Sequence, residues 1–100
     1  MILSNVFYKI EKITAGTKVL TKIGTPSQSH VAFTNTDIDN MLGVTNTSNA
    51  NTVIFIMNGD GQANAVHFTT TYLSGEWYAV GESSWTGSLR VNYIIVRFTI

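Results

Sequence analysis

Residues 58–64, NGDGQAN, place Asn58, Asp60, Gln62 and Asn64 between two apolar runs. Amide and carboxylate groups of this kind can hydrogen-bond to sugar hydroxyls, so Asn58, Asp60 and Gln62 are candidate ligand-binding residues. The segment also has a purely structural interpretation, because Asn-Gly and Asp-Gly are the strongest short signals for a β-hairpin turn. We expect a hairpin turn, with a sugar site as the functional alternative.

Known metal and phosphate loops do not fit this segment. An EF-hand calcium loop needs glycine at its sixth position and glutamate at its twelfth, and counted from Asn58 these positions hold Ala63 and Thr69. A phosphate-binding loop of the Walker type needs a lysine directly after its last glycine, whereas Gly61 is followed by glutamine. We therefore expect no metal site and no cofactor.

The chain shows no pattern typical of a catalytic site either. His30 and His67 do not occur in a metal-ligand spacing such as H-E-x-x-H, and no G-x-S-x-G nucleophile elbow is present. Glu76 and Glu82 could form a glycosidase pair only as any two carboxylates could. The chain has no cysteine, which excludes a thiolate nucleophile and a disulfide framework. We predict that the protein is not an enzyme.

The tryptophans are more informative than the titratable residues. Trp85 lies in ESSWTGS, where a tight turn would leave its ring partly exposed as a flat stacking surface. It is therefore the fourth candidate ligand-binding residue, although a ring folded back onto the end of the fold is an equal alternative. Trp77 opens an apolar strand, and we expect it in the core.

Composition narrows the class of protein further. The chain has 100 residues, the size of one domain, with 12% charged residues and a net charge of zero. No electrostatic attraction to nucleic acid is expected. No apolar stretch approaches the 18 residues of a membrane span, and the N-terminus does not read as a secretion signal. We expect no membrane insertion.

The pattern of apolar residues and turns predicts an all-β fold, an antiparallel sandwich or small jelly roll of about seven strands. A hairpin of residues 5–13 and 17–23, reversing at Ala15 and Gly16, comes first. One short helix follows over residues 36–43, capped by Thr36 and ended by Gly43. Residues 45–52, TNTSNANT, read as the most mobile surface loop. The remaining strands are expected as a meander over residues 52–57, 65–73, 77–82 and 89–100, after a strand at 28–34.

Two strands lack the alternation expected of a sheet with one wet face. VIFIM at residues 53–57 and YIIV at 93–96 are continuously apolar. The core residues that we predict are Val53, Ile54, Phe55, Ile56, Val80, Val91, Ile94 and Val96. Because both faces of these strands would need a cover, we expect a homo-oligomer, with the helix or a long loop as the alternative cover.

Residues 53–98, with MNGDGQANAVHFTTTYLSGEWYAV and then GSLRVNYIIVRF, resemble the compact C-terminal tip domains of bacteriophage tail fibres and similar virion knobs or head fibres. Residues 1–50 carry no such match. The resemblance implies a trimeric β domain located in the virion, in contact with other virion proteins. It also implies binding of a host glycan through loops at the exposed end, with Asn58, Asp60, Gln62 and Trp85 as contacts.

The first functional expectation is thus a receptor-binding, glycan-recognising tail-fibre tip or knob. The alternative is a capsid decoration (cement) or head-fibre protein that stabilises the virion shell. A third possibility is a free-standing small lectin outside any virus.

Overall fold

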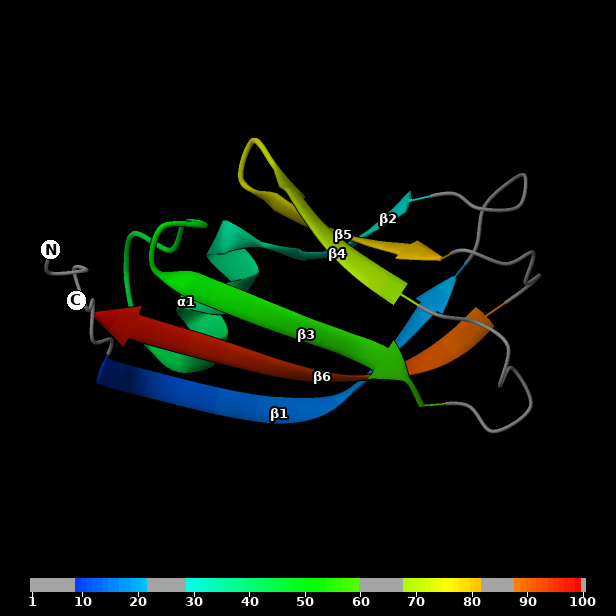
Figure 1. Cartoon of the computed structure of the whole chain (residues 1–100), viewed down its shortest axis with the longest axis horizontal. Helices are drawn as coiled ribbons and strands as arrows, with labels where there is room; N and C mark the ends of the chain where they lie inside the picture. Colours follow the sequence, from blue (N-terminus) through cyan, green and yellow to red (C-terminus); the bar gives the residue numbers. More distant parts are fainter. Residues whose placement is uncertain (1–8, 22–28, 60–67, 82–87, 100) are drawn as a thin grey trace, which may run out of the picture.

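The computed structural model describes residues 9–21, 29–59, 68–81 and 88–99 of the chain. In this part the chain forms six strands and one short helix (Figure 1). They are β1 (Lys9–Thr21), β2 (Ser29–Thr34), α1 (Asn35–Leu42), β3 (Thr52–Asn58), β4 (Phe68–Leu73), β5 (Glu76–Gly81) and β6 (Ser88–Thr99). The predicted all-β, sandwich-like class with one connecting helix is confirmed.

The strands form two three-stranded antiparallel sheets. Sheet 1 has the order β1-β6-β3 and sheet 2 the order β2-β5-β4. The predicted meander is therefore wrong, because β3 and β4 lie in different sheets, and so do β5 and β6. Turn residues indicate where a strand ends but not which strand it pairs with. Here the long β6 pairs with β1 on one side and with β3 on the other.

The predicted hairpin at Ala15 and Gly16 is also wrong, because β1 runs straight through both residues. Gly16 lies opposite Tyr93 in β6, and a Cβ atom at this position would lie only 2.7 Å from the Tyr93 hydroxyl oxygen. The glycine thus makes room for an aromatic ring in the neighbouring strand rather than for a turn. The pairing register of β1 with β6 shifts between Ile10 and Lys12, which places a β-bulge at Glu11.

The helix is found at the predicted place, but it begins and ends one residue earlier than predicted, at Asn35 and Leu42. Its N-cap is Thr34, not Thr36: the Thr34 hydroxyl accepts from the Asp37 N–H, and the Asp37 carboxylate accepts from the Thr34 N–H. This capping box satisfies two main-chain donors at once. Gly43 ends the helix in the left-handed region with φ 67°, as predicted. In the described residues, no helix has the length and apolar character needed to cross a membrane.

The core lies between the inner faces of the two sheets and α1. Its buried residues are Leu20, Ala32, Phe33, Ile38, Leu42, Ile54, Ile56, Trp77, Ala79, Val91 and Ile95. Ile38 and Leu42 belong to α1, so the helix closes the inner side of sheet 1 (Figure 1).

The predicted core is correct for one face of β3 and wrong for the other. Ile54, Ile56 and Val91 are buried, whereas Val53 and Phe55 remain 37% and 53% exposed. Val80, Ile94 and Val96 are half-buried. β3 alternates strictly between buried and exposed residues, because side chains of a strand point to opposite faces whatever their type. The apolar run thus places apolar residues on the outer face as well.

The β4–β5 hairpin turns through Ser74 and Gly75, which have φ of 50° and 82°. Two consecutive residues with positive φ are typical of a type I′ turn. Asn35 links this hairpin to the helix: its side chain donates to the Tyr72 hydroxyl (2.8 Å) and accepts from the Trp77 indole N–H (3.0 Å). Trp77 is buried, as predicted.

Candidate functional site

Of the four predicted ligand-binding residues, the structure describes only Asn58. It is half-buried at the end of β3, opposite Val91 of β6. The next residue, Gly59, donates its N–H to the Arg90 carbonyl oxygen at 2.9 Å. Asp60, Gln62 and Trp85 lie outside the described residues. The segment after Asn58 does not close a β3–β4 hairpin, because these strands belong to different sheets.

The strand ends that flank these residues gather at one end of the molecule (Figure 1). At this end, the residues that lie opposite each other in paired strands are Thr21 and Ser88, Asn58 and Val91, Ser29 and Val80, and Phe68 and Gly81. Lys9 and Thr99, the first and last described residues, pair at the opposite end. The segments that carry the candidate residues therefore start and finish close together in space.

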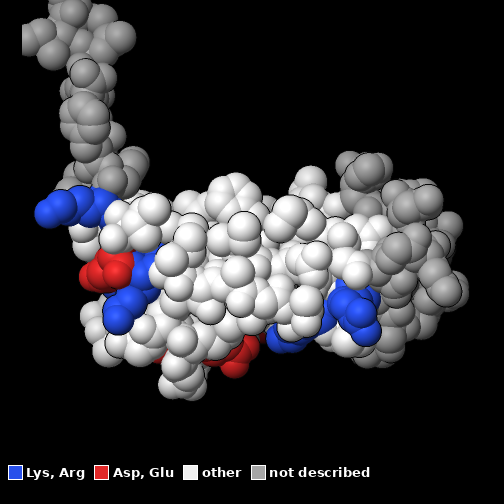
Figure 2. Space-filling view, turned by 90° about the horizontal axis from the view of Figure 1, so that it is seen from below, with Lys and Arg blue, Asp and Glu red and all other residues white. Residues whose placement is uncertain are grey.

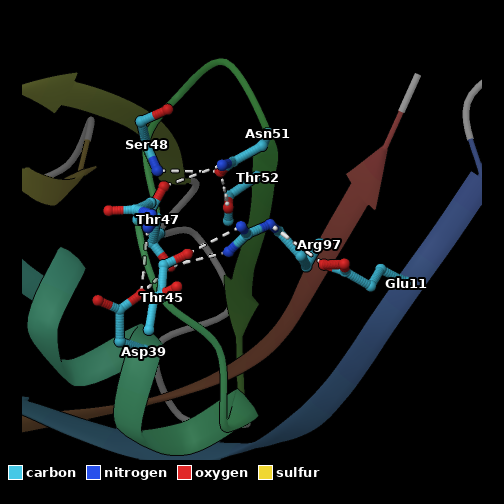
Figure 3. A network of polar contacts seen from close by, with 9 residues as sticks. Glu11, Asp39, Thr45, Thr47, Ser48, Asn51, Thr52 and Arg97 are labelled. Carbon is cyan, nitrogen blue, oxygen red and sulfur yellow. Dashed lines mark hydrogen bonds and ion pairs between the residues drawn. The ribbon is translucent and has the colours of Figure 1, made fainter.

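A polar network at the opposite end joins the loop after α1 to sheet 1 (Figure 3). Arg97 of β6 donates through Nη2 to the Thr45 carbonyl oxygen at 2.9 Å and through Nη1 to the Thr47 hydroxyl oxygen at 3.4 Å. Its Nε lies 3.5 Å from Oε1 of Glu11, the bulged residue of β1. The Asp39 carboxylate of α1 accepts from both the N–H and the hydroxyl of Thr47.

Hydrogen bonds also join residues of this loop to one another. The Asn51 side chain accepts from the Ser48 N–H and the Thr52 hydroxyl and donates to the Asn46 carbonyl oxygen. Thr47 and Thr52 are buried. Residues 45–52 are thus held at many points, unlike the free surface loop that their composition suggests. Because its groups bind one another, the network is a structural anchor and leaves little capacity for a ligand.

The outer face of sheet 1, away from α1 and sheet 2, is apolar. It comprises exposed Ile13 and Val19 of β1, exposed Val53, Phe55 and Met57 of β3, and half-buried Ile94, Val96 and Phe98 of β6. The register places Ile13, Val96 and Val53 in one row across the sheet, and Ala15, Ile94 and Phe55 in the next. No described helix or strand covers this face.

On one long side of the molecule, charged side chains leave the middle of the surface free. Figure 2 shows lysines and arginines at both ends of one long side, with a broad uncharged surface in the middle and a few acidic and basic residues along one margin.

An apolar groove of about 650 Å³ runs along the open edge of β3. Four consecutive residues of β3, Ile54 to Met57, and three of β4, Phe68 to Thr70, form its walls together with Ile94. β3 and β4 are both edge strands of their sheets in the described part of the chain. Within residues 9–21, 29–59, 68–81 and 88–99, no strand pairs with these two edges on this side of the sandwich.

A smaller hollow of about 330 Å³ lies on the outer face of sheet 2, between Thr71, Leu73, Tyr78 and Val80. The Tyr78 hydroxyl donates to a Glu76 carboxylate oxygen at 3.2 Å. This hydrogen bond to the carboxylate, with desolvation and the negative charge of Glu76, raises the pKa of Tyr78 above 10.0. An aromatic ring beside a carboxylate is a weaker candidate site, because this hollow is smaller than the groove beside β3.

Within the described ranges, no three His, Cys, Asp or Glu side chains gather as metal ligands.

No protein-family model, no curated protein and no solved structure matches this chain.

Proposed function

We propose that this protein is a non-enzymatic structural subunit that acts by packing the outer face of sheet 1 against protein. The single observation that carries this proposal is the exposure of Ile13, Val19, Val53, Phe55 and Met57 on one sheet face, where a charged residue, Arg90, lies opposite Val19 at one end. Contiguous apolar surface of this kind marks an interaction site on a soluble domain. It also accounts for the continuous apolar runs of β3 and β6.

The size of the face indicates what kind of assembly it supports. Burying the exposed half of a large apolar side chain contributes about 1 kcal/mol, so the five exposed residues offer on the order of 5 kcal/mol per copy. Association costs about 4 to 15 kcal/mol in lost freedom of motion. This face alone therefore supports weak self-association, and a tight assembly needs further contacts. A subunit held by several neighbours, as in a particle shell, satisfies that condition.

The resemblance of residues 53–98 to virion knobs and head fibres supports the same proposal. We place the protein in the virion, as a decoration or head-fibre subunit in contact with its own copies and with other virion proteins. The trimer that the resemblance implies is one arrangement in which the face of sheet 1 is covered.

Sedimentation of the purified chain over a wide range of concentrations tests this role. The wild type should rise above the monomer mass of 11.0 kDa as concentration increases. Ile13→Glu should stay closer to the monomer, because the new charge would be buried in the contact. Leu73→Glu is the matched control, since Leu73 is 62% exposed on sheet 2 while Ile13 is 60% exposed. A wild type that remains monomeric throughout, or equal effects of the two variants, contradicts the proposal for self-contact.

A receptor-binding tip is the second candidate, favoured by the convergence at one end of the strand ends that flank residues 60–67 and 82–87. In that role Asn58, Asp60, Gln62 and Trp85 would contact a host glycan. Asp60→Asn should then weaken glycan binding by about 1 to 3 kcal/mol, and Trp85→Ala by about 0.5 to 1.5 kcal/mol. A glycan array with both variants and the wild type measures this. Absence of any bound glycan removes this candidate.

A further inference from the structure

The two sides of the sandwich differ in how their strand edges are protected. An exposed strand edge attracts other strands, and proteins commonly block it with lysines, bulges or a covering group. β1 carries Lys9, Lys12 and Lys18 and has a bulge. β2, the edge of sheet 2 on the same side, has a register shift between Val31 and Phe33.

One lysine closes that side directly. Lys18 of β1 donates through its Nζ to the carbonyl oxygen of Ala32, the residue at the β2 irregularity, and stands 4.6 Å from the centre of the Phe33 ring. The contact joins sheet 1 to sheet 2 at the two edge strands of this side. The β1–β2 side therefore resists strand addition.

β3 itself has neither a lysine nor a bulge. Its sequence, TVIFIMN, contains no charged residue and no proline, and its register with β6 has no shift. β4, FTTTYL, is uncharged as well. Uncharged strands of this length with branched and aromatic residues are the kind that pair with another chain when their edge is open. The groove of about 650 Å³ lies along this edge.

The hydrogen bonds at the two ends of β3 show which main-chain groups face outward. Gly59 donates to the Arg90 carbonyl oxygen, and the Asn51 carbonyl oxygen accepts from Phe98. Because hydrogen-bonded positions alternate along an antiparallel strand, the odd-numbered residues of β3 bond to β6. The N–H and C=O groups of Ile54 and Ile56 then point away from β6, along the open edge.

We infer that β3 pairs antiparallel with β3 of a second copy of this chain, about a two-fold axis at Phe55. In this register Ile54 of one copy lies opposite Ile56 of the other. The outward N–H of each residue then donates to the outward C=O of the residue opposite. Phe55 then faces Phe55 of the second copy on the outer face of the sheet, at a non-hydrogen-bonded position where side chains are closest.

A second copy suits this edge better than a charged segment would. Burying a charge in an uncharged groove is unfavourable, whereas β3 offers the same neutral, β-forming sequence on both sides, and the chain has no net charge to repel its copy. Two-fold contacts of one patch with itself are the commonest way in which identical chains associate. The pairing joins both sheets 1 into one six-stranded sheet and doubles its apolar outer face. The inference rests on the proposed assembly role and names the partner as a second copy.

A single introduced cysteine tests the register, because the chain has no cysteine of its own. In the proposed pairing, the Cβ atoms of position 55 lie roughly 4.5 to 5.5 Å apart, so Phe55→Cys should form a disulfide-linked dimer under mild oxidation. Val53→Cys is the matched control on the same exposed face. It lies opposite Met57 of the second copy, about 13 Å along the strand from its own equivalent, and should stay monomeric on a non-reducing gel.

Equal cross-linking of the two variants, or none with Phe55→Cys, overturns the inference. A circular dichroism spectrum of each variant that matches the spectrum of the wild type confirms that the variant folds. If association depends on Ile13 but Phe55→Cys does not cross-link, the face proposal stands and the edge pairing fails.

Amide hydrogen exchange of the unmodified protein gives a second measurement. The amides of Ile54 and Ile56 should become slower to exchange as concentration rises, because they gain partners only in the dimer. The amides of Val53, Phe55 and Met57 bond to β6 in every state and serve as internal controls. Ile54 and Ile56 amides that exchange fast at all concentrations also overturn the edge pairing.

Discussion

Replacing Arg97 with methionine should destabilise the fold by about 3 kcal/mol, because this side chain holds the loop of residues 43–51 on sheet 1. Its side chain is only 12% exposed, and methionine keeps most of the apolar stem while it removes the guanidinium. The change therefore isolates the polar contacts of Arg97 from the packing of its stem.

The magnitude follows from the three contacts. The 2.9 Å bond from Nη2 to the Thr45 carbonyl oxygen involves a charged donor and contributes about 2 kcal/mol. The 3.4 Å contact to the Thr47 hydroxyl is long and contributes about 0.5 kcal/mol. The ion pair with Glu11 is discounted to about 0.5 kcal/mol, since the Glu11 side chain is 39% exposed and screened by solvent. The sum is a large share of a stability of about 5 to 15 kcal/mol.

Denaturant unfolding measures the loss, with Glu11→Gln as the matched variant. Glu11→Gln removes only the ion pair and should cost less than about 1 kcal/mol. The amide of Thr47, which donates to the Asp39 carboxylate, should also exchange faster in Arg97→Met than in the wild type. A loss below about 1 kcal/mol for Arg97→Met, or equal losses for both variants, would refute the view that the two loop contacts dominate.

Three further results are expected. Gly16→Ala should cost about 1 to 3 kcal/mol in denaturant unfolding, because the new Cβ would lie 2.7 Å from the Tyr93 hydroxyl; Tyr93→Phe in the same chain should restore part of the loss. Thr34→Ala removes the helix cap and should cost about 1 kcal/mol, which the same measurement checks. Tyr78 has its pKa raised by the Glu76 carboxylate, so the folded state holds this proton more tightly than the unfolded chain. Its contribution to stability is then present below pH 10.0 and is lost as the pH rises through the folded-state pKa. Glu76→Gln should lower the Tyr78 pKa, as read from tyrosinate absorbance after subtraction of a Tyr78→Phe titration.

Local signals in the sequence located the helix and most of the strands, but not the continuity of β1 or the pairing of the strands. The helix was located because an acidic first turn and a terminal glycine are read within a few residues, although the choice between Thr34 and Thr36 as cap depends on where β2 ends. Gly16 has two local interpretations, a turn or a close approach. Only the position of Tyr93 on β6, far along the chain, decides between them. Strand order has no local signal of this kind.

The candidate site divides in the same way. The apolar run of β3 indicated a surface that needs a cover, yet the choice of Phe55 as a core residue was wrong, because alternation places it outward. The anchor at Arg97 had no signal at all, since Thr45 and Arg97 are 52 positions apart and neither belongs to a motif. The predicted glycan contacts Asp60, Gln62 and Trp85 remain predictions outside the described residues.

Edge pairing and glycan display make opposite demands on the orientation of neighbouring copies, so one experiment bears on both proposals. In an antiparallel pairing of β3 with itself, the two-fold axis is perpendicular to the strands. The strand ends at Asn58 and Phe68 then point in opposite directions in the two copies, and both cannot face one host surface. A receptor-binding tip instead needs its loop ends on the same side, as a symmetry axis along the strands provides. A Phe55→Cys dimer would thus favour a subunit embedded in a protein layer over a fibre tip. A glycan-binding protein with no such cross-link would favour the tip.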